Sequence, residues 1–252
     1  MHPKIKFFLK SNYPQFFVKL LNLKKIITLF FTKKKNFLSL NPVSSIYGLD
    51  RGTPIDRYYI NNFITKNSQL IKGKILEVGD DRYSQNFKNS ILSVDVLTKD
   101  IDENIKKNLD TRSNYFFGDF EQDLNLKNNY YDCLILTQVF QCIYKIETAI
   151  KNAFKTLKSG GSCLITLPGI NQNSAYDADR YGDYWRFTIQ SAKKIFEVIE
   201  SEIKDIEVNS YGNVLVASNF LYGLSYEEIK KKNLTFKDLN YPIIITIKIT
   251  KK

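Results

Sequence analysis

The sequence predicts an α/β fold in which a parallel sheet is covered by helices on both faces. From residue 70 onward, short apolar runs alternate with segments of helical periodicity, a pattern typical of repeated strand–helix units. The chain has 252 residues, of which 43% are hydrophobic and 25% are charged. This composition favours one folded α/β domain with an appendage over a disordered chain.

The expected strands are short apolar runs that follow one another along the chain. They cover residues 74–79, 89–96, 114–120, 130–140, 160–169 and 243–250. A helix is predicted at 146–157, with Gly160 and Gly161 as its stop signal, and a second helix at 189–199, with Thr188 as its N-cap. Before the last strand, "VNSYGNVLVA" is followed by "SYEE", a capping box that should open a helix.

The N-terminal region, residues 1–43, is predicted to be a basic amphipathic helical arm, and residues 44–252 are predicted to be the main domain. Residues 1–49 contain nine lysines and no acidic residue, so they carry nine of the eleven net positive charges. Apolar residues recur at helical spacing along 15–31, and Pro42 marks a linker. Because the domain itself is nearly balanced in charge, nucleic acid is not the expected partner.

Three roles are open for this arm: packing on the domain, binding an anionic membrane surface, or docking on a partner protein. Its apolar segments are interrupted by lysine, so neither a membrane-spanning helix nor a signal peptide is expected. We therefore expect a cytoplasmic protein that is at most peripheral to a membrane.

Cysteine and histidine usage limits the chemistry of the domain. The three cysteines form no C-x-x-C pair and suit reduced, buried thiols in a reducing compartment. The single histidine is His2, beside the start of the chain, so neither a histidine base nor a histidine-ligated metal is expected in the core. No metal site is predicted.

Polar residues and glycines stand at the ends of the predicted strands. In an open α/β sheet, ligands bind beyond the carboxyl ends of the strands, so these residues are the candidate site. They are Glu77, Gly79, Asp95, Asp119, Thr137 and Gln138.

The order "LEVG", "VDV", "FFGDFEQDL", "YYDCLILTQVFQCI" and "LKSGGSCLITLPG" resembles the class I S-adenosylmethionine-dependent methyltransferases of type 11. The resemblance implies a Rossmann-like, doubly wound, mostly parallel seven-stranded sheet and S-adenosylmethionine as cofactor. It further implies that Asp95 binds the ribose, that Asp119 lies by the adenine, and that Thr137 and Gln138 line the methionine side. Without the resemblance, Asp95 is a turn residue that ends its strand.

The loop after the first strand departs from this family. Of the glycines that the family prefers, only Gly79 is kept in "GDDRY". S-adenosylmethionine has no pyrophosphate and depends less on a glycine-lined anion cradle than dinucleotides do. Binding of the cofactor is therefore still expected.

A nearer resemblance comes from residues 44–64, 175–188 and 210–224, which are similar to bacterial methyltransferase-like proteins associated with glycosyltransferases and surface-polysaccharide synthesis. It implies O-methylation of a saccharide or glycan precursor. The alternative is a non-catalytic scaffold that keeps the fold and partners a glycosyltransferase.

The connection "PGINQNSAYDADRYGDYWRFT" is long and rich in tyrosine, aspartate and arginine, which is typical of a functional loop. Aromatic faces and hydrogen-bonding side chains suit a sugar, so Tyr184, Trp185 and Arg186 are the candidate substrate-binding residues. Asp183 and Asp179 are the candidate catalytic bases, with Asp177 as a third. The alternative is a structural lid in which Arg186 pairs with Asp183.

The segment "DRGTPIDRYYI" before the first domain helix has two open interpretations. One of its arginines pairs with the carboxylate of the cofactor, or Asp56 forms an internal ion pair with Arg51 or Arg57.

Overall fold

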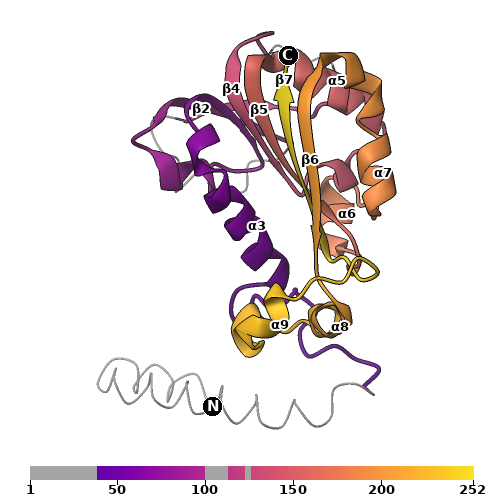
Figure 1. Cartoon of the computed structure of the whole chain (residues 1–252). Helices are drawn as coiled ribbons and strands as arrows, with labels where there is room; N and C mark the ends of the chain where they lie inside the picture. The colour runs from indigo at the N-terminus through magenta and orange to yellow at the C-terminus, as the bar shows by residue number, and fades with distance from the viewer. Residues whose placement is uncertain (1–38, 100–112, 123–125) are drawn as a thin grey trace, which may run out of the picture.

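The computed structural model of the chain describes residues 39–99, 113–122 and 126–252 (Figure 1). Its centre is a seven-stranded sheet in the order β3-β2-β1-β4-β5-β7-β6. β7 runs antiparallel to both of its neighbours, and the other paired strands are parallel. The prediction of a Rossmann-like, mostly parallel seven-stranded sheet is confirmed. Nearly all of the predicted N-terminal arm lies outside the described residues.

Six of the seven strands lie close to the runs that the sequence predicts, and β6 is a strand that none of these runs covers. Their bounds are β1 Gly73–Val78, β2 Ile91–Thr98, β3 Ser113–Phe117, β4 Tyr131–Thr137, β5 Leu157–Pro168, β6 Ile203–Tyr211 and β7 Ile244–Lys251. β2 extends two residues past its predicted end, because Leu97 pairs with Val78 of β1 and Thr98 pairs with Phe117 of β3. This longer pairing moves the carboxyl end of β2 away from Asp95.

Six α-helices of the described residues connect or cover these strands. They are α3 Ile55–Lys66, α5 Ile146–Thr156, α6 Ala175–Arg180, α7 Ile189–Lys194, α8 Val214–Leu221 and α9 Lys231–Thr235. Among these described helices, none is long and apolar enough to cross a bilayer.

Local signals for helix ends are partly confirmed. Thr188 caps α7 through a reciprocal capping box with Ser191, as predicted. The "SYEE" capping box also forms, between Ser225 and Glu228, but it opens only the 3₁₀ turn Tyr226–Glu228. The predicted glycine stop after α5 is wrong, because the helix ends at Thr156 and Gly160 lies inside β5.

The helices cover both faces of the sheet, with α3 on one side and α5 and α7 on the other (Figure 1). α5 and α7 pack on a large apolar cluster that includes Leu134, Leu136 and Ile165. α3 and α8 pack on a second cluster, on the opposite face, that includes Ile75 and Ile135. Successive residues of β4 alternate between these two clusters, as a strand buried on both faces requires.

Candidate functional site

A large cavity of about 1160 Å³ lies where the carboxyl ends of the parallel strands meet the connecting segments. We distinguish two halves. The strand-end half is lined by the last residues of strands β1, β2 and β4 and by the residues that directly follow β1 to β4, namely 78–80, 97–99, 118–120 and 137–139. The loop half is lined by residues of 45–57, 141–143 and 171–186. The volume of the whole cavity exceeds that of a typical pocket for one small ligand, so the cavity has room for two reactants.

The loop after β1 is organised by Glu77. Its buried carboxylate accepts hydrogen bonds from the backbone N–H groups of Tyr83 and Ser84, both at 2.9 Å. Burial raises the pKa of Glu77 to about 8, even though these hydrogen bonds lower it. Glu77 was predicted to touch the cofactor. The structure instead places it beneath the cavity, where it fixes the loop.

Gly79 lies in the strand-end half, as predicted. Its φ of +93° is one that side-chain-bearing residues rarely adopt, and a Cβ added there would meet no atom within 4 Å. The open space above this glycine belongs to the cavity. The backbone of the loop can therefore be approached closely by a ligand.

The prediction that Asp95 ends its strand and faces the ligand is wrong. Asp95 lies inside β2, in register with Leu76 and Asn114. It is buried, and its carboxylate accepts hydrogen bonds from Tyr131 Oη at 2.7 Å and Asn114 Nδ2 at 3.0 Å. Thr98 and Lys99 occupy the end of this strand at the cavity.

Asp119, Thr137 and Gln138 line the cavity, as predicted. Asp119 forms an ion pair with Lys99 at 2.5 Å, so the carboxylate is held in place at the wall. Gln138 has a φ of +56°, and its backbone N–H donates to the carbonyl oxygen of Thr166 at 3.0 Å. Such a conformation costs free energy and is typical of residues at functional sites.

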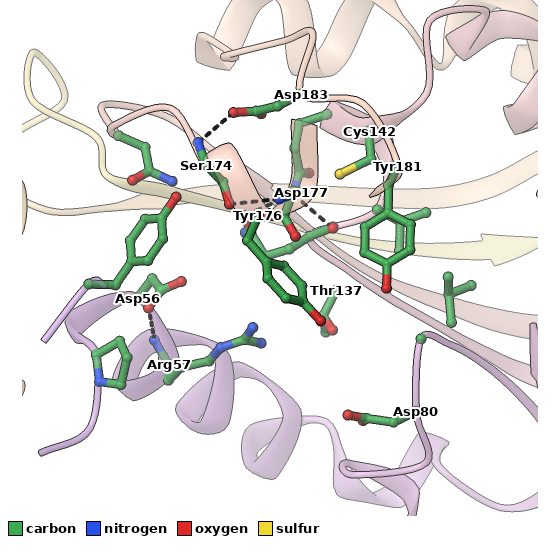
Figure 2. Close-up of a pocket in the computed structure, with 18 of the residues that line it drawn as sticks. Asp56, Arg57, Asp80, Thr137, Cys142, Ser174, Tyr176, Asp177, Tyr181 and Asp183 are labelled. Atoms are coloured by element: carbon green, nitrogen blue, oxygen red, sulfur yellow. Dashed lines mark hydrogen bonds between the residues drawn. The ribbon is translucent and has the colours of Figure 1, made fainter. Parts of the chain in front are cut away.

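In the loop half, Asp183 is part of an ion pair. Arg186 donates two hydrogen bonds to it, at 2.7 and 2.8 Å. The backbone N–H of Ser174 donates a third at 2.9 Å (Figure 2). Burial disfavours the charged carboxylate, but these hydrogen bonds outweigh it and hold the pKa of Asp183 below its ordinary value. The predicted role of Asp183 as a base is therefore not supported. The alternative prediction, that Arg186 pairs with Asp183 in a structural lid, describes this ion pair correctly.

Other residues of the predicted loop site lie outside the cavity. Asp179 is exposed on α6. Tyr184 and Trp185 form an exposed aromatic cluster with Tyr144, whose ring stacks on Trp185 at 5.8 Å. Trp185 Nε1 donates to the carbonyl oxygen of Ile143, so the cluster borders the cavity wall.

The sequence left the roles of Asp56 and Arg57 open, because an arginine of their segment could pair with the carboxylate of the cofactor or with Asp56. Both project from the first turns of α3 into the cavity, opposite Tyr176 and Asp177 of α6 (Figure 2). Arg57 donates to the hydroxyl of Tyr83 at 2.8 Å, and no carboxylate of the described residues lies within ion-pair distance of it. Arg51 instead pairs with Glu228, so the two arginines of this segment have different roles.

Three buried polar atoms of the loop half have no hydrogen-bond partner among the described residues. They are Gln141 Oε1, Asn171 Oδ1 and Arg186 Nε. Gln141 is only 7% exposed, so water cannot easily replace a missing partner. The three atoms are themselves enclosed, so a small rotation of their side chains would be needed to turn two acceptors and one donor toward a ligand. These amides carry no sequence signal, because only the tertiary structure brings them together.

Comparisons with known proteins agree with this architecture. Residues 76–165 match the profile of the methyltransferase domain family. A search of curated proteins finds no match.

Three solved structures are similar in fold. A methyltransferase from Archaeoglobus fulgidus is 14% identical with a TM-score of 0.50, over 78% of this chain and 94% of that one. The N-methyltransferase NodS from Bradyrhizobium japonicum, in complex with S-adenosyl-L-homocysteine, is 11% identical with a TM-score of 0.51, over 83% and 94%. Phosphoethanolamine N-methyltransferase 2 from Haemonchus contortus, in complex with S-adenosyl-L-methionine, is 16% identical with a TM-score of 0.52, over 77% and 52%. The chain thus has the fold of S-adenosylmethionine-dependent methyltransferases, with a methyltransferase domain match at its centre.

Proposed function

We propose that this chain is an S-adenosylmethionine-dependent methyltransferase that methylates a hydroxyl group of a saccharide or glycan precursor. The observation that carries the proposal is the two-part cavity at the carboxyl ends of the parallel strands. The strand-end half suits the cofactor and the loop half suits a polar acceptor.

The residues of the strand-end half fit S-adenosylmethionine. Gly79 leaves the space that a Cβ would fill, and Asp119 offers a fixed carboxylate. From the loop half, Arg57 donates to Tyr83 of the loop after β1 and lacks a carboxylate partner among the described residues, so it suits the carboxylate of the cofactor's methionine part. This assignment agrees with the interpretation in which an arginine of the segment "DRGTPIDRYYI" pairs with the carboxylate of the cofactor.

The loop half supports a polyhydroxyl acceptor. The two unpartnered amide oxygens, of Gln141 and Asn171, require hydrogen-bond donors, whereas Arg186 Nε requires an acceptor. A hydroxyl group supplies both functions, and a sugar presents several on adjacent carbons. The aromatic cluster of Tyr144, Tyr184 and Trp185 at the cavity wall adds an exposed surface for a further sugar ring of a longer acceptor.

When bound, the cofactor supplies an electrophilic methyl group on a cationic sulfur. The protein's part is to align the acceptor hydroxyl with that methyl group, since in-line displacement depends strongly on orientation. Gln141, Asn171 and Arg186 would hold the acceptor, and Gln138 and Thr137 line the strand-end half at the end of β4.

Calorimetric titration of the full chain with S-adenosylhomocysteine tests the cofactor part of this proposal. We expect a dissociation constant below millimolar. A chain that does not bind S-adenosylhomocysteine at millimolar concentration would support the alternative, a non-catalytic scaffold that partners a glycosyltransferase.

We further propose that the N-terminal arm binds an anionic membrane surface. Its nine lysines support this, because each lysine near such a surface contributes about 1 kcal/mol. Removal of residues 1–38 should abolish sedimentation with anionic liposomes and leave intact the contacts of Ser39 and Val43 with Tyr222. Equal sedimentation of the full and shortened chains would instead leave domain packing or a protein partner as its role.

A further inference from the structure

Three carboxylates line the loop half of the cavity: Asp56, Asp177 and Asp183. The three carboxylates differ in their hydrogen-bond and ion-pair partners. Asp183 is committed to Arg186 and Ser174, and its low pKa makes it a poor proton acceptor. Asp177 lies on the first turn of α6, whose N-cap is Ser174.

Asp56 has the environment of a base. The hydrogen bonds to its carboxylate come from backbone N–H groups at the start of α3, among them that of Arg57 at 2.8 Å. Burial raises the pKa of Asp56 above its ordinary value, and the nearby charge of Arg57 offsets this only in part. The other groups around this space are Asp80 and Tyr83 of the loop after β1, and Asp177 and Tyr181 of α6 and its end.

The segment that carries Asp56 is fixed in place. Ser44 Oγ donates to Asp50 at 2.5 Å, Thr53 N–H donates to Glu227, and Pro54 forms a β-bridge with Ser225. Tyr47, on the same segment, lines the cavity with a φ of +60°. Strained backbone of this kind persists only where the surroundings determine it, and it clusters at functional sites.

We propose that Asp56 is the base that takes the proton of the acceptor hydroxyl. The proposal rests on the proposed hydroxyl methylation. A lone pair of the hydroxyl oxygen forms the new bond to the methyl carbon, and the carbon–sulfur bond breaks with its electron pair going to sulfur. The hydroxyl proton moves to a carboxylate oxygen of Asp56, which later releases it to solvent. The sulfonium charge is thereby lost and one proton is released.

The first test needs no acceptor. A carboxyl group whose pKa is raised by folding makes the protein less stable as the pH rises from about 4 through the raised pKa. The melting temperature of Asp56→Asn, relative to that of the native chain, should therefore increase between pH 4.5 and 7.5. Glu147→Gln removes an exposed acid from the first turn of α5 and should show no such slope. A flat difference for Asp56→Asn would overturn the proposal.

The second test measures methyl transfer from radiolabelled S-adenosylmethionine to glycerol and to a panel of methyl glycosides. Asp56→Asn should lower kcat by about 100- to 10,000-fold and remove the acidic limb of the pH–rate profile, while the affinity for S-adenosylhomocysteine stays within threefold. An unchanged kcat would refute the role of Asp56. No transfer by the native chain would refute hydroxyl methylation, and the slope in melting temperature would still report on Asp56.

Discussion

The two halves of the cavity are built by different means. The position of the strand-end half is set by strand pairing in the sheet. For example, the register of β1 and β2 pairs Val78 with Leu97 and thereby fixes where these two strands end. The loop half is joined by hydrogen bonds between residues distant in sequence, such as that from Gln172 Nε2 to the backbone carbonyl oxygen of Ser45, 127 residues away. A sheet can therefore keep a cofactor site constant while the contacts to the acceptor change independently.

The largest expected effect concerns the ion pair that holds the loop half. Asp183 is 4% exposed, so Asp183→Asn leaves the guanidinium of Arg186 without its partner and should lower the free energy of unfolding by about 3 kcal/mol. Urea denaturation at pH 7 measures this loss. Because folding lowers the pKa of Asp183, its contribution should fade as the pH drops below about 4.

Asp179→Asn is the matched control for this loop. Asp179 is exposed on the same segment, and its replacement should change the unfolding free energy by less than about 0.5 kcal/mol. Equal effects of the two variants would show that the loop half does not depend on the Asp183–Arg186 pair.

A methyl group at Gly79 should damage the strand-end half alone. Gly79→Ala places its Cβ in the space proposed for the cofactor, so the affinity for S-adenosylhomocysteine should fall about 100-fold, or about 2.7 kcal/mol. Gly160→Ala is the control, because Gly160 also has a positive φ of +75° and open space around it, but it is exposed on β5.

Both glycine variants should lose a similar amount of stability, about 1 kcal/mol, from backbone strain. If both variants bound S-adenosylhomocysteine equally well, Gly79 would not border the cofactor, and the strand-end half would not be the cofactor site.

The smallest expected effect concerns Gln141, whose amide oxygen lacks a partner in the described structure. Gln141→Met removes this oxygen and also the hydrogen bond that Nε2 donates to the carbonyl oxygen of Gln138 at 2.8 Å, so the free energy of unfolding should fall by about 1 kcal/mol. Loss of one hydrogen bond should raise KM for the best methyl glycoside about tenfold with little change in kcat. An unchanged KM in steady-state kinetics would place the acceptor away from Gln141.

Much of the strand-end half could be predicted from sequence. Gly79, Asp119, Thr137 and Gln138 line the cavity as expected, because each follows an apolar run that forms a strand. Asp95 was placed wrongly, because strand pairing continues to Thr98 and local sequence does not show where pairing stops.

The loop half was predicted less well. Aromatic and charged residues marked the connection after β5 as important, yet Tyr184 and Trp185 pack with Tyr144 outside the cavity. Asp56 and Arg57 reach the cavity only because α3 packs beside the strand ends, far from that connection in sequence.

The sequence by itself determined the fold class, the strand order along the chain and the glycine at the end of β1. These properties depend on local periodicity and on the conformations that single residues allow. Only the tertiary structure decided that Asp183 is neutralised by Arg186, that Asp95 is enclosed by Tyr131 and Asn114, and that Asp56 faces the cavity. The physical reason is that the protonation and availability of a carboxylate depend on burial and on partners that packing brings from other parts of the chain.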